Sequence, residues 1–177
     1  METLAAAIRN IPGFPRPGIQ FKDITPLLAD ADCFRQAIDA LKERHAGKGI
    51  DIVVGIEARG FIFAAALAYA LGSGLCLVRK PGKLPHAVHR QAYELEYGTD
   101  AVEIHTDAFQ PGQKILIVDD VLATGGTVAA TVKLIQDNFD VEISEINFLI
   151  ELAFLNGRAR LPGLPVHALV RQASRCR

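Results

Sequence analysis

The chain has 177 residues, half of them hydrophobic, with a formal net charge of -1 and a pI of about 6.5. This length suits one domain with a sizeable core, and the charge balance gives no global attraction to nucleic acid or to an anionic membrane. The three cysteines (Cys33, Cys76 and Cys176) form no CxxC pair and have neither zinc-site nor disulfide-framework spacing, which is typical of reduced thiols in a cytosolic protein.

The N-terminal sequence lacks the basic start and the long apolar centre of a signal peptide. The most apolar helical segment, "FIFAAALAYALG" (61–72), is too short to span a bilayer. We therefore expect a cytoplasmic protein that contacts neither membrane nor nucleic acid.

The first thirty residues predict an arm ahead of the main fold. Residues 2–9 predict a short helix, and the prolines and glycines between 12 and 18 predict an ordered turn or arm. The stretch "GIQFKDITPLL" (18–28) predicts a strand-like piece.

After this arm, helices and strands alternate. A helix is expected over about 33–46, with Asp30 or Asp32 as its cap. Further helices are expected at 61–71 and 127–138, and strands at 50–55, 75–78, 101–105, 114–118, 143–152 and 166–170. The stretch 79–99 shows no periodicity.

This rhythm predicts an α/β fold in a single domain (1–177), with a mostly parallel, twisted sheet flanked by helices. In such sheets, ligands bind beyond the carboxyl ends of the strands. Two loops are expected there: 56–60 and 119–127.

The stretch "ILIVDDVLATGGT" (115–127) joins a buried strand to a helix through two acids and a glycine turn. Backbone N–H groups of such a turn can converge on a phosphate, and Thr124 and Thr127 can add hydroxyl donors. Asp119 and Asp120 repel phosphate, so we expect them to face vicinal sugar hydroxyls with Mg²⁺ nearby. A capping Asp followed by an ordinary glycine turn is the alternative.

This stretch resembles the phosphoribosyl pyrophosphate motif of the type I phosphoribosyltransferases. The wider chain resembles the adenine phosphoribosyltransferases more narrowly, over nearly its full length. The blocks that carry this likeness are "FKDITPLL" (21–28), "GIEARGF" (55–61), "RKPGKLP" (79–85) and "YELEYG" (93–98).

The resemblance implies transfer of phosphoribosyl from 5-phosphoribosyl 1-pyrophosphate to adenine, giving AMP and pyrophosphate with Mg²⁺. It implies a type I phosphoribosyltransferase-like fold with an N-terminal hood for the base (1–30) and a flexible lid (79–100). It also implies a homodimer, in which Arg79 is our candidate for reaching the neighbouring subunit's site.

The resemblance also implies the roles of individual residues. The ribose and 5′-phosphate are assigned to Asp119, Asp120, Ala123, Thr124, Gly125, Gly126 and Thr127. The pyrophosphate is assigned to Glu57, Ala58, Arg59, Gly60, Arg79, Lys80 and Lys83. The adenine pocket is assigned to Gln20, Phe21 and Val121.

The catalytic set implied by the resemblance is Glu96, Tyr97 and Arg59. Glu96 would help to move a purine proton, Tyr97 would lie over the reacting ribose, and Arg59 would lie near the base as well as the pyrophosphate. No direct protein ligand is firmly expected for Mg²⁺, which substrate and water would mainly hold, with Asp119 and Asp120 nearby.

Two alternatives stay open. A regulatory protein could keep this site as a phosphoribosyl pyrophosphate sensor, although the chain shows no helix-turn-helix segment and no basic excess. An enzyme of the same family could use another base, such as hypoxanthine, xanthine or orotate.

Overall fold

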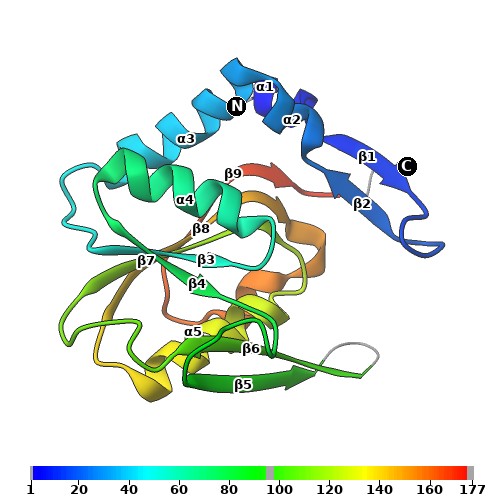
Figure 1. The fold of residues 1–177 in the computed structure, drawn as a ribbon. Coiled ribbons are helices and arrows are strands. Elements are labelled where there is room, and N and C mark those ends of the chain that lie inside the picture. The colour runs from blue at the N-terminus through cyan, green and yellow to red at the C-terminus, as the bar shows by residue number, and fades with distance from the viewer. Residues whose placement is uncertain (1, 95–97, 175–177) are drawn as a thin grey trace.

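The centre of the fold is a five-stranded, fully parallel sheet with the strand order β4-β3-β7-β8-β9 (Figure 1). The structure is a computed structural model, and it describes residues 2–94 and 98–174. The strands of the sheet are β3 (Ile52–Ile56), β4 (Gly74–Val78), β7 (Lys114–Leu122), β8 (Glu142–Leu152) and β9 (Val166–Gln172). The predicted α/β fold with a parallel sheet is therefore confirmed.

Helices cover both faces of this sheet (Figure 1). α3 (Ala31–His45) and α4 (Gly60–Leu71) lie on one face, and α5 (Gly126–Asn138) lies on the other. Of the two caps expected for α3, Asp30 is the one used, because its carboxylate accepts the N–H groups of Asp32 and Cys33 at 2.9 Å.

Strand β7 shows how one apolar run serves two cores. Leu116 and Val118 pack into the core shared with α3 and α4, while Ile115 and Ile117 pack into the core shared with α5. Successive side chains of a strand point to opposite faces, so a strand covered on both sides needs an unbroken apolar run.

The N-terminal arm differs in detail from its prediction. α1 (Glu2–Ala6) is shorter than expected, and β1 (Arg9–Pro12) follows it and pairs with β2 (Gln20–Asp23) as an antiparallel hairpin. The predicted strand over 18–28 is wrong in its second half, which forms α2 (Thr25–Ala29). Pro26 lies in the first turn of α2, where its missing N–H costs no helical hydrogen bond.

The second hairpin lies in the segment predicted to be aperiodic. β5 (Val88–Glu94) pairs antiparallel with β6 (Thr99–His105), and the hairpin packs against α5. The strand expected at 101–105 is confirmed within β6, whereas the expectation of no regular structure was wrong for 88–94. The role of a lid for 79–100 stays a prediction. Two short 3₁₀ turns, η1 (Ala153–Leu155) and η2 (Gly157–Arg160), follow β8.

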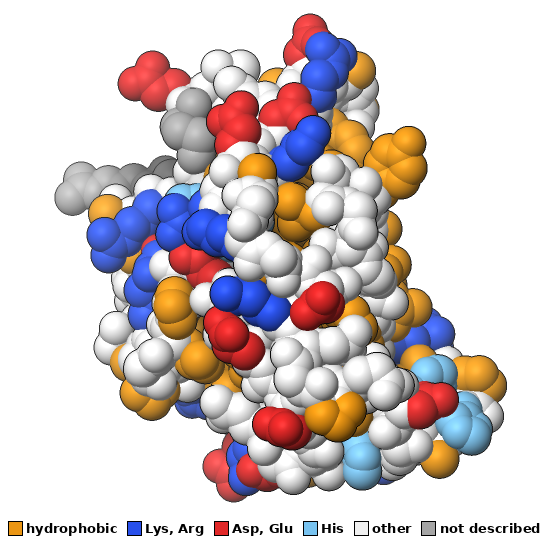
Figure 2. Space-filling view, turned by 90° about the vertical axis from the view of Figure 1, so that its left-hand side faces the viewer, with side chains coloured by type: hydrophobic (Ala, Val, Ile, Leu, Met, Phe, Trp, Pro, Cys, Tyr) orange, Lys and Arg blue, Asp and Glu red, His pale blue; other side chains and the backbone are white. Residues whose placement is uncertain are grey.

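The surface carries charges of both signs. Figure 2 shows Lys and Arg side chains gathered toward one edge of the face in view, with Asp and Glu side chains among and around them. Within the described part of the chain, none of the helices combines the length and the apolar character that crossing a membrane requires.

A buried polar cluster joins the end of α3 to β8. Arg44 donates two hydrogen bonds of 2.6 Å to the Glu145 carboxylate. His45, which is 1% exposed, has its Nε2 at 3.3 Å from both Glu145 and the Asn147 amide oxygen. Burial lowers the pKa of His45 below its ordinary value, against the opposing effects of Asn147 and Glu145.

This cluster makes stability depend on pH. Because the pKa of His45 is lower in the folded protein, the unfolded chain binds more protons once the pH falls through about 6.5. We expect the free energy of unfolding, measured with urea, to fall between pH 7 and pH 5.5, by at most about 1.4 kcal/mol per pH unit for one group.

The matched variants are His45→Gln, which should flatten this slope, and His86→Gln on the exposed surface, which should leave it unchanged. Some slope remains in His45→Gln, because burial also lowers the pKa of His167. An unchanged slope in His45→Gln would show that the cluster does not govern stability in this range.

Candidate active site

The turn between β7 and α5 forms a small cradle, here defined as residues 123–127. A hollow of about 80 Å³ lies over it, lined by Asp119 and residues 121–128. Gly125 has a φ of +80°, a conformation that residues with a Cβ rarely adopt. The cradle ends at the start of α5, whose first N–H groups have no partner within the helix and suit an anion.

The turn η2 supports the cradle from behind through two close backbone approaches. A Cβ on Gly125 would lie 2.6 Å from the Gly157 carbonyl oxygen, and one on Gly157 would lie 2.3 Å from the Ala123 carbonyl oxygen. Arg158 holds η2 to β8 by two hydrogen bonds, of 2.7 and 2.8 Å, to the buried Glu151 carboxylate. The sequence prediction missed this support, since only Gly157 hints at a close approach.

Asp119 and Asp120 both lie near the carboxyl end of β7, but their carboxylates have different partners. The Asp119 carboxylate accepts the Asp120 N–H at 2.8 Å, and the Asp120 carboxylate lies 2.7 Å from the Arg59 guanidinium. Burial and the charge of Asp120 raise the pKa of Asp119 well above its ordinary value. Burial also raises the pKa of Asp120, although Arg59 opposes this effect. Groups that donate hydrogen bonds, such as sugar hydroxyls, would stabilise the charged form of this pair.

Arg59 joins the acids to the N-terminal arm. Its guanidinium donates a 2.9 Å hydrogen bond to the Lys22 carbonyl oxygen and lies 4.8 Å from the centre of the Phe21 ring. The structure therefore brings three parts of the predicted site around one side chain: the arm, the loop after β3 and the end of β7.

The loop after β3 contains a cis peptide bond between Glu57 and Ala58. Gly60, at the start of α4, has no room for a side chain, because a Cβ there would lie 2.8 Å from the Asp119 carboxylate. Gly60 therefore lets α4 begin directly against β7.

The basic segment after β4 is held by Glu57. Arg79 lies 3.2 Å from the Glu57 carboxylate, and the Lys80 N–H donates to the same carboxylate at 2.9 Å. Burial opposes ionisation of Glu57, but these donors hold its pKa below the ordinary value. Arg79 also donates to the Lys83 carbonyl oxygen at 3.0 Å, so Arg79 faces its own chain.

The residues predicted for the adenine pocket lie on β2 and β7. Phe21 and Gln20 are neighbours on β2, and the Phe14 ring packs edge-on against Phe21 at 5.1 Å between centroids. Val121 directly follows Asp120, which shares the Arg59 guanidinium with Phe21. Glu96 and Tyr97 lie outside the described residues, between the ends of β5 and β6.

Comparison with known proteins agrees with this geometry. The family model for the phosphoribosyl transferase domain matches residues 25–155. The adenine phosphoribosyltransferase of Chloroflexus aurantiacus is 57% identical over 169 residues, which cover 96% of this chain and 97% of that protein.

Two solved structures share the fold. The adenine phosphoribosyltransferase of Thermoanaerobacter pseudethanolicus has a TM-score of 0.92 and 49% identity, covering 97% of this chain and 99% of that one. The enzyme of Saccharomyces cerevisiae, solved with adenine and an imino-altritol bisphosphate, has a TM-score of 0.90 and 41% identity, covering 95% and 97%. With a match of this extent and a site in the expected place, the chain belongs to the adenine phosphoribosyltransferase family of the phosphoribosyltransferases.

Proposed function

We propose that this protein is a purine salvage enzyme that transfers phosphoribosyl from 5-phosphoribosyl 1-pyrophosphate to adenine, giving AMP and pyrophosphate. The observation that carries this proposal lies at the carboxyl end of β7. There the cradle, whose backbone can bind an anion, adjoins the neighbouring carboxylates of Asp119 and Asp120. A phosphorylated ribose matches both, with its phosphate in the cradle and its hydroxyl groups on Asp119 and Asp120. Relatives across nearly the whole chain are adenine phosphoribosyltransferases.

Much of the rate would come from positioning and electrostatics. Departure of pyrophosphate from the anomeric carbon builds positive charge on the ribose and negative charge on the leaving group. Arg79 and Lys83 supply cations along one segment, where the Glu57 carboxylate holds the Arg79 guanidinium and accepts the Lys80 backbone N–H. The backbone of residues 58–60 adds N–H groups at the same edge.

Adenine would bind between the hood and the end of β7. Phe21 offers a ring face, Val121 offers an apolar surface, and backbone groups around Gln20 can distinguish an exocyclic amine. The Arg59 guanidinium ties the hood strand to Asp120, so the base slot and the ribose site are held at a fixed spacing. The yeast relative was solved with adenine, which supports this choice of base.

We propose Mg²⁺ as the cofactor. Among the described residues, no three His, Cys, Asp or Glu side chains come together as a metal site. Asp119 and Asp120 provide negative charge at the rim, and Asp120 is already paired with Arg59. These residues fit an ion held mainly by substrate oxygens and water, and that ion would neutralise charge on the leaving pyrophosphate.

We place the reaction in the cytoplasm. Cys33 and Cys76 are free thiols, which is typical of a reducing compartment. Of the two, Cys33 is buried in the core, so its thiol serves packing.

We also propose a homodimer that forms through α4 and the edge strand β4. Large apolar side chains are exposed on both elements: Ile62, Tyr69, Leu75 and Leu77. An edge strand with an exposed apolar surface favours association with another chain. Arg79 directly follows β4, so a subunit seated there would lie next to the basic segment.

The reaction itself is tested by turnover on different bases. We expect AMP from adenine and 5-phosphoribosyl 1-pyrophosphate, and little product with hypoxanthine, xanthine or orotate. Chelation of Mg²⁺ with EDTA should stop the reaction, and added Mg²⁺ should restore it. Product with another base instead of adenine would show that the enzyme uses a different substrate. Absence of any product would favour the alternative that the protein is a phosphoribosyl pyrophosphate sensor.

The role of Glu96 is tested by Glu96→Ala. If Glu96 moves the purine proton, kcat should fall about 10²- to 10⁴-fold, with only a modest change in the Kd of either substrate. Glu94→Ala, two residues earlier in the sequence and at the end of β5, is the matched control and should keep wild-type kinetics. Unchanged kinetics in Glu96→Ala would remove this residue from the mechanism.

The dimer is tested by Leu75→Glu. The Leu75 side chain is 44% exposed, so the folded subunit should tolerate glutamate, whereas an apolar interface should not. Sedimentation velocity should show a dimer for the wild type and a monomer of about half that mass for the variant, with an unchanged circular dichroism spectrum. A wild-type monomer would contradict the proposal.

A further inference from the structure

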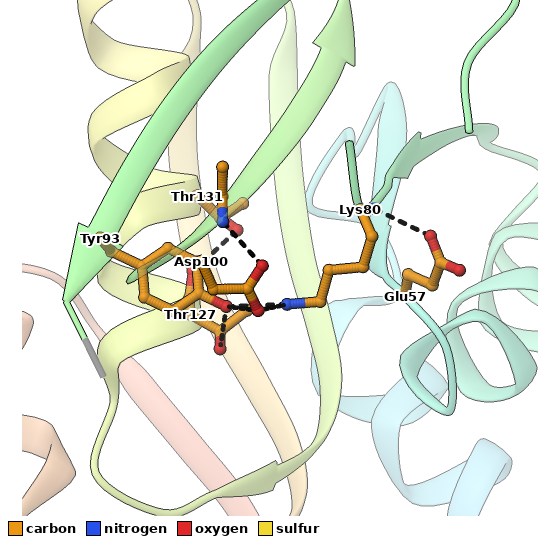
Figure 3. A network of polar contacts seen from close by, with 7 residues as sticks. Glu57, Lys80, Tyr93, Asp100, Thr127 and Thr131 are labelled. Carbon is orange, nitrogen blue, oxygen red and sulfur yellow. Dashed lines mark hydrogen bonds and ion pairs between the residues drawn. The ribbon is translucent and has the colours of Figure 1, made fainter. Parts of the chain in front are cut away.

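A polar network connects the basic segment after β4 to the cradle (Figure 3). Tyr93 on β5 lies directly opposite Asp100 on β6, and its hydroxyl group accepts a hydrogen bond of 2.8 Å from the Lys80 ammonium. The Lys80 ammonium also forms an ion pair with the Asp100 carboxylate. On the other side, the Tyr93 hydroxyl oxygen lies 3.1 Å from the Thr127 hydroxyl oxygen.

The ring of Tyr93 is fixed against the cradle itself. A Cβ on Gly126 would lie 3.7 Å from the Tyr93 ring, so the ring packs beside the first residue of α5. The Thr127 carbonyl oxygen accepts a 3.0 Å hydrogen bond from the Thr131 hydroxyl group, which fixes the backbone at that position. Both partners of the Tyr93–Thr127 contact are therefore held by their surroundings.

The available protons determine the direction of each bond. Although burial opposes it, the Lys80 ammonium and the Ala101 N–H hold the pKa of Asp100 below its ordinary value, so Asp100 acts only as an acceptor at neutral pH. Tyr93 has one proton, which it donates to Asp100 at 3.1 Å. The Thr127 hydroxyl group is then the donor toward Tyr93.

This arrangement brings the Lys80 ammonium close to the cradle. A single oxygen atom, that of Tyr93, is in hydrogen-bond contact with both the ammonium and the Thr127 hydroxyl group. When the Thr127 hydroxyl group donates its hydrogen bond to a phosphate instead, Tyr93 still keeps its bonds to Lys80 and Asp100. The network can therefore accept a phosphate in the cradle without releasing the cation.

We infer that Tyr93 and Asp100 are positioning residues that hold the Lys80 ammonium beside Thr127, so that this cation serves the 5′-phosphate. This assignment rests on the proposed function, and it differs from the resemblance, which groups Lys80 with the pyrophosphate residues. Of the two cations that directly follow β4, Arg79 turns toward Glu57, while Lys80 is held by the hairpin residues Tyr93 and Asp100.

The test uses two product-like inhibitors that separate the two phosphate regions. Ribose 5-phosphate carries the 5′-phosphate alone, and pyrophosphate carries the other end. In Tyr93→Phe and in Asp100→Asn, we expect the inhibition constant for ribose 5-phosphate to rise about fivefold, as for loss of one hydrogen bond that positions a charge. The constant for pyrophosphate and the KM for adenine should stay within about twofold of wild type.

Two further variants show whether the effect passes through Lys80. In a Lys80→Met background, Tyr93→Phe should cause no further rise in the inhibition constant for ribose 5-phosphate, because the effects of coupled residues are not additive. Asp137→Asn is the matched control, since it breaks another Lys–Asp pair, to Lys133 at 2.6 Å, on the exposed side of α5. This control should leave both inhibition constants unchanged.

The outcomes are distinct. A wild-type enzyme without turnover on adenine would overturn the proposed function. An active wild type whose Tyr93→Phe and Asp100→Asn variants lose pyrophosphate affinity, or lose neither, would overturn this inference alone. A general loss of folding would appear in the thermal unfolding midpoint and would affect both inhibitors equally, which would also count against the positioning role.

Discussion

The ion pair between Arg59 and Asp120 is the interaction on which the arrangement of the site depends. Two adjacent carboxylates at the end of a buried strand repel each other, and burial increases the cost of charging them. Arg59 offsets this cost at Asp120 and uses its other contacts to hold Lys22 and Phe21. Loss of one partner costs about 3–5 kcal/mol in fully buried pairs, and less here because 35% of the Arg59 side chain is exposed.

The parallel sheet explains why these residues meet at all. In such a sheet all strands end at the same edge, so the segments after β3, β4, β7 and β8 become neighbours although they are far apart in sequence. The first three carry the loop with Arg59, the basic segment and the cradle. The fourth carries η2, which binds no ligand in our proposal but sets the position of the cradle through Gly157.

Local signals in the sequence predicted the sheet, the main helices and the loops of the site. The apolar run of β7 and the Asp30 cap of α3 are such signals, because the cause of the structure lies within a few residues. β5 escaped prediction because its apolar positions are few and its support comes from α5. The pairing of Lys80 with Asp100 depends on the register of a hairpin, and the bracing of the cradle depends on η2; neither has a local signature.

The two hydrophobic cores support different parts of the proposed site. Ile24 and Leu27, which anchor the N-terminal arm, belong to the core that contains Phe63 and Leu116, while Val128 at the start of α5 belongs to the core with Ile117. The proposed base site and the start of α5 thus rest on different layers of packing, on opposite faces of the sheet. A substitution that changes the side-chain volume of one core would shift one end of the proposed site relative to the other. It would therefore change the length of ligand that fits, although no residue in contact with the ligand is altered.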